Sequence, residues 1–143
     1  MKRFPNIPNI HPKVWGKTTW KFLHAVSLTY PDNPTDEQKH AMRALFNSLV
    51  HTLPCHNCRI NLTKELAHMP IDVSSKQALN TWLLRLHNQV NQRLGQTQMS
   101  VDDVMQLVFK QEETKPTISC VTLVILIVVC IITVVVHWRL RKM

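Results

Sequence analysis

The chain has 143 residues, four cysteines and a formal net charge of +8 when histidine is counted as neutral. Two of the cysteines fall inside one long apolar segment. The other two are too few for a disulfide framework, or for a structural zinc site unless histidines join them. The basic residues can face anionic lipid or an acidic partner, but they are scattered rather than clustered, which argues against a nucleic-acid-binding protein.

The predicted elements are all helices, because no stretch alternates like a strand and the chain contains only two glycines. Residues 1–11 form an N-terminal extension. A first helix is expected over residues 13–30, and the sequence YPDNP then breaks the chain. The apolar side of this helix is formed by Trp15, Phe22, Leu23, Val26 and Tyr30.

A second helix is expected to start where Thr35 and Gln38 match a capping box. Its apolar stripe consists of Met42, Leu45, Phe46, Leu49, Val50 and Leu53. Pro54 ends this helix or starts the next one. A short third helix is expected over residues 55–67, with a Cys-x-x-Cys sequence at its N-terminus.

A fourth helix is expected over about residues 75–94, preceded by a second predicted capping box formed by Ser74 and Gln77. Ser100 and Asp103 open a fifth helix. The apolar stripe of the fifth helix consists of Val101, Val104, Met105, Val108 and Phe109.

The segment 118–136 is apolar and carries no charge. As a helix it would span roughly 28 Å, close to the thickness of a bilayer's hydrocarbon core. We therefore expect a transmembrane helix over residues 118–138, rather than a buried core helix, with a linker before it at 112–117 and a basic tail after it at 139–143. So short a tail indicates tail-anchored insertion after translation, with residues 1–117 in the cytosol.

Cys55 and Cys58 are the residues on which a functional hypothesis can be built. At a helix N-terminus, the backbone N–H groups and the helix dipole stabilise a thiolate, and two thiols three residues apart can close a disulfide within one turn. This is the geometry of a redox-active pair. Two alternatives stay open: a pair of cysteines without function, and a zinc site that recruits nearby histidines. The histidines near the pair are His51, His56 and His68.

Two other uses of a Cys-x-x-Cys sequence are excluded. Arg59 rather than histidine follows Cys58, which excludes attachment of a c-type haem. A thioredoxin fold requires βαβ units, and this sequence has no strand pattern to supply them. The cysteine pair therefore needs an all-helical setting that can accept its electrons.

The helices on either side of the pair carry the sequences VWGKTTWKFLH at residues 14–24 and WLLRLHNQVNQRLG at residues 82–95. The order W-G-x-x-x-W-x-x-x-H, then Y-P, then P-C-x-x-C, then H-N-x-V-N-x-x-L-G resembles the ERV/ALR family of FAD-linked sulfhydryl oxidases. The resemblance covers about residues 12–111 and is greatest to the small versions encoded by large DNA viruses. It implies an all-α fold, in which a four-helix bundle with a short fifth helix binds FAD non-covalently at the bundle mouth.

The resemblance also implies roles for individual residues. Cys55 and Cys58 would be catalytic, with Cys55 as the outer sulfur and Cys58 facing the flavin, and no metal is expected. The residues that match the family's FAD contacts are Trp15, Gly16, Trp20, His24, Tyr30, Cys58, His87, Asn88, Val90, Asn91, Arg93, Phe109 and Lys110. Arg93 and Gln96 stand where relatives have lysines, and Phe109 stands where many have tryptophan.

The activity that the resemblance implies is the oxidation of protein dithiols, with electrons passing from the cysteine pair through FAD to O2 to give H2O2. Many cellular relatives carry a second, shuttle cysteine pair, which residues 1–117 lack. We therefore expect the partner to be a small Cys-x-x-Cys or thioredoxin-like protein, and we expect the enzyme to be a homodimer.

By analogy with the viral relatives, the expected role is disulfide formation in virion proteins, at a host intracellular membrane or at the virion membrane. Two other hypotheses remain. One is a non-enzymatic, tail-anchored envelope or scaffold protein, which would tolerate loss of either cysteine. The other is a membrane-tethered thiol reductase or isomerase without flavin.

Overall fold

The computed structural model describes residues 9–110 and 120–142. The chain divides into two compact units, Met1–Lys110 and Gln111–Met143. Most of the predicted extension, the whole predicted linker and the first two residues of the predicted transmembrane helix lie outside the described residues.

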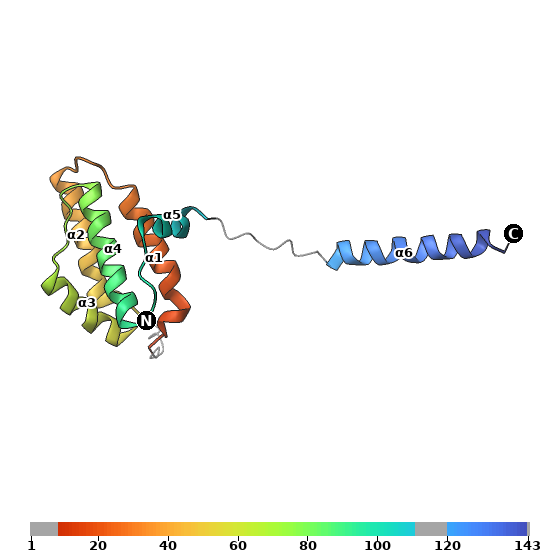
Figure 1. Cartoon of the computed structure of the whole chain (residues 1–143), viewed down its shortest axis with the longest axis horizontal. Helices are drawn as coiled ribbons and strands as arrows, with labels where there is room; N and C mark the ends of the chain where they lie inside the picture. The colour runs from red at the N-terminus through yellow and green to blue at the C-terminus, as the bar shows by residue number, and fades with distance from the viewer. Residues whose placement is uncertain (1–8, 111–119, 143) are drawn as a thin grey trace, which may run out of the picture. The chain divides into compact units, whose positions relative to one another are not determined.

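The described part of the first unit, residues 9–110, contains five helices (Figure 1). They are α1 (Pro12–Leu28), α2 (Asp36–Thr52), α3 (His56–His68), α4 (Lys76–Arg93) and α5 (Val101–Phe109). The described residues contain no strand, so the predicted all-α class is confirmed for this part of the chain. Helix α1 packs against α4 and α5, and α2 packs against α3.

Short-range hydrogen bonds explain where the helices begin. Helix α2 starts with the predicted capping box, in which the Gln38 N–H donates to Thr35 Oγ1 and the Thr35 N–H donates to Gln38 Oε1. The predicted box at Ser74 is wrong. Ser75 caps α4 by accepting a hydrogen bond from the Ala78 N–H, while the Ser74 side chain donates to Asp72 Oδ1 over 2.7 Å.

The core lies between α1, α2 and α4. Its buried apolar residues are Leu23, Tyr30, Phe46, Val73, Leu79, Trp82, Leu83 and Leu86. Phe46 packs edge-on against Trp82, with ring centroids 5.0 Å apart. Two predicted stripes are only partly buried: Phe22 of α1 is 55 % exposed, and of the α5 stripe only Val104 is buried.

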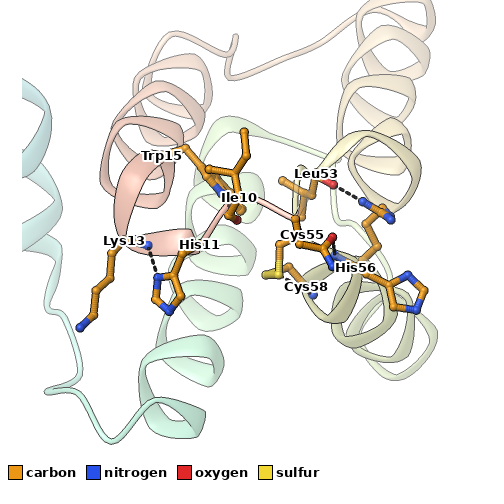
Figure 2. Close-up of a disulfide and its surroundings, with 10 residues drawn as sticks. Ile10, His11, Lys13, Trp15, Leu53, Cys55, His56 and Cys58 are labelled. Carbon is orange, nitrogen blue, oxygen red and sulfur yellow. Dashed lines mark hydrogen bonds between the residues drawn. A yellow bond between two sulfur atoms is a disulfide. The ribbon is translucent and has the colours of Figure 1, made fainter. Parts of the chain in front are cut away.

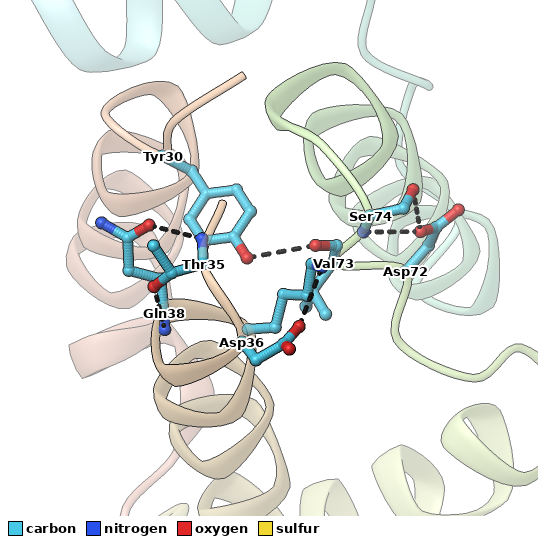
Figure 3. Close-up of polar contacts among 8 residues, drawn as sticks. Tyr30, Thr35, Asp36, Gln38, Asp72, Val73 and Ser74 are labelled. Atoms are coloured by element: carbon cyan, nitrogen blue, oxygen red, sulfur yellow. Dashed lines mark hydrogen bonds and ion pairs between the residues drawn. The ribbon is translucent and has the colours of Figure 1, made fainter. Parts of the chain in front are cut away.

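A hydrogen bond ties the C-terminal end of α1 to the loop before α4. The Tyr30 hydroxyl donates to the Val73 carbonyl over 3.1 Å, and both residues are buried (Figure 3). Burial raises the pKa of the Tyr30 phenol, which keeps the hydroxyl protonated as the donor. Tyr30 therefore holds two loops of the bundle together.

The second unit contains one described helix, α6 (Cys120–Leu140). Its segment Leu123–Leu140 has a mean hydropathy of 2.7, so α6 is long and apolar enough to cross a membrane, judged by length and composition. Helix α6 extends two residues beyond the predicted end at residue 138. Arg141 and Lys142 follow it.

Candidate active site

Cys55 and Cys58 form a disulfide at the N-terminus of α3, with Cα atoms 5.2 Å apart (Figure 2). Cys55 is the N-cap of α3, and its Sγ accepts a hydrogen bond from the Cys58 N–H over 3.2 Å. The predicted position of the pair at the start of the third helix is confirmed. Because N–H groups at a helix N-terminus favour negative charge, this position stabilises a Cys55 thiolate after reduction.

A cavity of about 740 Å³ lies beside the disulfide, between the ends of the four long helices. This volume is within the range of pockets that bind small molecules and cofactors. Eight of the predicted site residues line it: Trp15, Gly16, Trp20, Cys58, His87, Val90, Asn91 and Arg93. Cys58 lines the cavity and Cys55 does not.

A stack of aromatic rings forms the cavity wall between α1 and α4. The Trp20 and His87 rings are stacked, with centroids 3.9 Å apart and planes at 7°. Behind them, His24 Nε2 lies 3.0 Å from His87 Nδ1, so one imidazole donates a hydrogen bond to the other. Burial lowers the pKa of each histidine to about 4, and at His87 the charge of His24 adds to this effect. Both rings are therefore neutral near pH 7.

The two asparagines of the H-N-x-V-N sequence fix the loop between α4 and α5. The Asn88 amide makes two hydrogen bonds with the Met99 backbone, of 2.9 and 2.7 Å, and Asn91 donates to the Thr97 carbonyl over 3.2 Å. Met99 lines the cavity, but Asn88 does not. Asn88 therefore holds a wall of the cavity in place from behind.

Arg93, which matches a family phosphate contact, forms an ion pair with Glu65 of α3. Both side chains line the cavity, and the Glu65 side chain is only 17 % exposed. Glu65 was missed by sequence reasoning, because an acidic residue in a helix is normally a solvated surface residue. The other lining residues missed from the sequence include Leu49, Leu53, Leu62, Met99 and Leu107.

Five predicted contact residues do not line the cavity: His24 and Asn88, which lie behind its wall, and Tyr30, Phe109 and Lys110. Tyr30 bonds to Val73, the Phe109 side chain is 65 % exposed, and the Lys110 carbonyl accepts a hydrogen bond from Lys21 Nζ over 3.5 Å. The roles of all five residues as FAD contacts remain predictions.

Comparison with known proteins matches this chain to a single protein family. The model of the Erv1 / Alr family matches residues 17–112. The chain is 37 % identical over 102 residues to the probable FAD-linked sulfhydryl oxidase R368 of Acanthamoeba polyphaga mimivirus, covering 69 % of this chain and 71 % of that relative. It is 32 % identical over 100 residues to the putative FAD-linked sulfhydryl oxidase 096R of Invertebrate iridescent virus 3, covering 68 % of each.

Cellular relatives are longer than this match. The chain is 35 % identical over 79 residues to the mitochondrial FAD-linked sulfhydryl oxidase ERV1 of Saccharomyces cerevisiae, but covers only 42 % of it. The crystal structure of the FAD binding domain of Erv1 from the same yeast superposes with a TM-score of 0.64 at 29 % identity, covering 68 % of this chain and 92 % of that domain. The yeast Erv1 core superposes with a TM-score of 0.63 at 26 % identity, covering 74 % and 90 %.

Proposed function

This chain belongs to the Erv1/Alr family, and we propose that it is an FAD-linked sulfhydryl oxidase that forms disulfides in protein substrates. The observation that carries the proposal is the disulfide at the N-terminus of α3. One of its cysteines, Cys58, lines a cavity of about 740 Å³, while the other, Cys55, stays outside that cavity. Such a pair can undergo thiol–disulfide exchange with a substrate at Cys55 and deliver electrons to a cofactor in the cavity at Cys58.

The residues that line the cavity fit FAD. Trp15 and Trp20 offer aromatic surfaces for a flavin or adenine ring. Lys13, Lys17 and Arg93 offer positive charge for a pyrophosphate. Bound there, FAD would supply a two-electron acceptor for the cysteine dithiol and a route for these electrons to O2, giving H2O2.

The chain's own residues perform the thiol exchange. A substrate thiolate attacks Cys55 Sγ, the bond between Cys55 and Cys58 breaks, and Cys58 leaves as a thiolate at the cavity wall. A second substrate thiolate then attacks the substrate sulfur of this mixed disulfide and releases Cys55. The substrate dithiol has lost two electrons and two protons, and the enzyme pair has gained both. The N–H of Cys58, which already donates to Cys55 Sγ, stabilises the released Cys55 thiolate.

The number of cysteines in the chain suggests what kind of partner protein it needs. No cysteine other than Cys55 and Cys58 occurs before Cys120. The shuttle function that a second pair would serve therefore falls to another molecule, a small Cys-x-x-Cys or thioredoxin-like protein. The enzyme acts as a homodimer, as its family resemblance implies.

The proposed location is a membrane, with the helical domain on the cytosolic side. The apolarity of α6 supports an anchor, since its mean hydropathy of 2.7 suits the hydrocarbon core. Two of the relatives are viral proteins named as sulfhydryl oxidases. By analogy with these viral relatives, the proposed role is the oxidation of virion proteins at a host intracellular membrane or at the virion membrane.

Oxygen consumption tests this function. The full-length chain, purified in detergent and loaded with FAD, is mixed with a reduced thioredoxin-like protein in an oxygen electrode. We expect one O2 consumed and one H2O2 formed for each disulfide made, and loss of both on Cys58→Ser. If the FAD-loaded protein consumes no oxygen with any dithiol, the oxidase function is wrong and a scaffold protein becomes the better hypothesis.

A further inference from the structure

A short N-terminal strap, residues 9–11, crosses the turn between α2 and α3 at the redox pair. Asn9 Oδ1 accepts a hydrogen bond from the His56 N–H over 3.1 Å, and the Ile10 N–H donates to the Pro54 carbonyl over 2.9 Å. Pro54 and His56 are the two chain neighbours of Cys55. The strap therefore holds the backbone on both sides of the outer cysteine.

The same strap is fixed at its other end to the cavity wall. The Trp15 indole N–H donates to the Ile10 carbonyl over 3.1 Å, and His11 caps α1 by accepting a hydrogen bond from the Lys13 N–H over 3.2 Å. Figure 2 shows Ile10 between Trp15 and Cys55. Through Ile10, the strap links a residue that lines the cavity to the turn that carries the disulfide.

Few other contacts hold this turn. Leu53 and Cys55 are the caps of α2 and α3, and each keeps one backbone hydrogen bond to its own helix. The Leu53 N–H donates to the Leu49 carbonyl, and the Cys55 carbonyl accepts from the Arg59 N–H, both over 3.1 Å. Among the described residues, only one other side chain forms a hydrogen bond to this turn: Arg59 donates to the Leu53 carbonyl. The His56 N–H is the first of α3 and has no partner within the helix. Asn9 supplies that partner.

We propose that the strap is a positioning element of the redox pair and that Asn9 is its positioning residue. This proposal rests on the proposed oxidase function and deepens it. The disulfide state restrains Cys55 covalently, whereas in the dithiol state only the backbone contacts keep the two sulfurs close. The strap restricts the dithiol state and so favours closure of the disulfide, by raising the effective concentration of one thiol at the other.

The test measures the redox equilibrium between glutathione and the pair Cys55 and Cys58 in the full-length protein in detergent. Alkylation of free thiols gives the fraction of the peptide with both cysteines that is in the dithiol state. Asn9→Ala removes the acceptor and should shift the equilibrium constant toward the dithiol by up to about fivefold, the limit set by one hydrogen bond worth about 1 kcal/mol. Asn9→Asp keeps a side-chain oxygen and should restore the wild-type value. Asn33→Ala, at an exposed asparagine in the loop between α1 and α2, is the matched control and should change nothing.

A second measurement separates positioning from simple structural support. The thermal unfolding midpoint of Asn9→Ala should fall by no more than the roughly 4–8 °C that corresponds to one hydrogen bond of about 1 kcal/mol, because Asn9 is exposed and outside the bundle core. An unchanged equilibrium constant would overturn the proposal, and so would a shift that Asn9→Asp fails to rescue or one accompanied by a larger fall in the unfolding midpoint. The glutathione equilibrium needs neither flavin nor oxygen, so its result is independent of whether oxidase activity is found.

Discussion

His24 and His87 share a hydrogen bond of 3.0 Å between Nε2 and Nδ1, and both rings are buried. Such a bond requires at least one ring nitrogen without a proton to act as acceptor. Protonating both rings would place two positive charges together inside the bundle. The pair therefore ties the stability of the bundle to pH.

The first prediction follows from the lowered pKa values of these histidines. An unfolded histidine has a pKa of about 6.5, whereas the folded pair have pKa values of about 4. Between these values the unfolded chain binds more protons, so the stabilisation is complete above pH 6.5 and is lost as the pH falls toward 4. We expect the free energy of unfolding to drop by a few kcal/mol over this range, on the order of magnitude of such shifts.

Urea unfolding at a series of pH values checks this prediction. His87→Gln removes one of the two buried groups and should make the slope against pH clearly shallower. His68→Gln, at an exposed histidine in the last turn of α3, should keep the wild-type slope. An equal slope in the wild type and in His87→Gln would show that other groups set the pH dependence.

The second prediction concerns Tyr30, which matches a family FAD contact but bonds to Val73 in the bundle. Tyr30→Phe leaves the buried Val73 carbonyl without its donor. The free energy of unfolding should fall by about 1–3 kcal/mol, the usual effect of such a loss, while the affinity for FAD should not change. Chemical unfolding and a flavin titration measure the two quantities. A weaker FAD affinity at unchanged stability would instead make Tyr30 a direct cofactor contact.

The third prediction concerns the ion pair between Glu65 and Arg93 at the cavity. In the proposed complex, the Glu65 carboxylate would compete with the FAD pyrophosphate for Arg93 and would repel it. Glu65→Gln removes the negative charge and should lower the dissociation constant for FAD about fivefold, if the partly exposed pair is worth about 1 kcal/mol. Quenching of flavin fluorescence measures this constant. Glu37→Gln, at an exposed glutamate in the first turn of α2, is the control. Weaker binding by Glu65→Gln would show that the ion pair shapes the site.

The fourth prediction distinguishes the two sulfurs. In Cys58→Ser, the Cys55 thiolate can attack an oxidised partner, and the mixed disulfide builds up relative to the wild type because Cys58 is no longer there to resolve it from the enzyme side. Cys55→Ser should trap far less, because Cys58 faces the cavity. Both variants should lose oxidase activity by about a hundredfold or more. Cys130→Ser, at an exposed free cysteine in α6, should keep full activity. Non-reducing electrophoresis reads the trapped species, and equal trapping by both variants would contradict the assigned roles.

Local chemistry explains which parts of the fold were predictable. The Thr35–Gln38 capping box and the helix start at the cysteine pair depend on residues within four positions of each other, so the sequence was sufficient. The box at Ser74 was predicted wrongly because two serines are adjacent, and Asp72 accepts hydrogen bonds from both the N–H and the hydroxyl of Ser74. Ser75, the next residue, therefore caps α4.

Contacts between distant segments explain what was missed in the site. Asn9 reaches His56, 47 positions away, and Glu65 reaches Arg93, 28 positions away. Nothing in a helical repeat shows that a surface-type residue faces a partner on another helix. The motif residues Trp20 and His87 were identified because the resemblance supplied their roles. Their stacking geometry came only from the structure.

The most direct test of the oxidase is the absorbance spectrum of the full-length protein, purified in detergent without added cofactor. We expect an oxidised-flavin spectrum that bleaches when dithiothreitol is added without oxygen, returns in air, and bleaches at least about a hundredfold more slowly in Cys58→Ser. A folded, helical protein that stays colourless even after FAD is added would contradict the claim that Cys58 delivers electrons to FAD in this cavity.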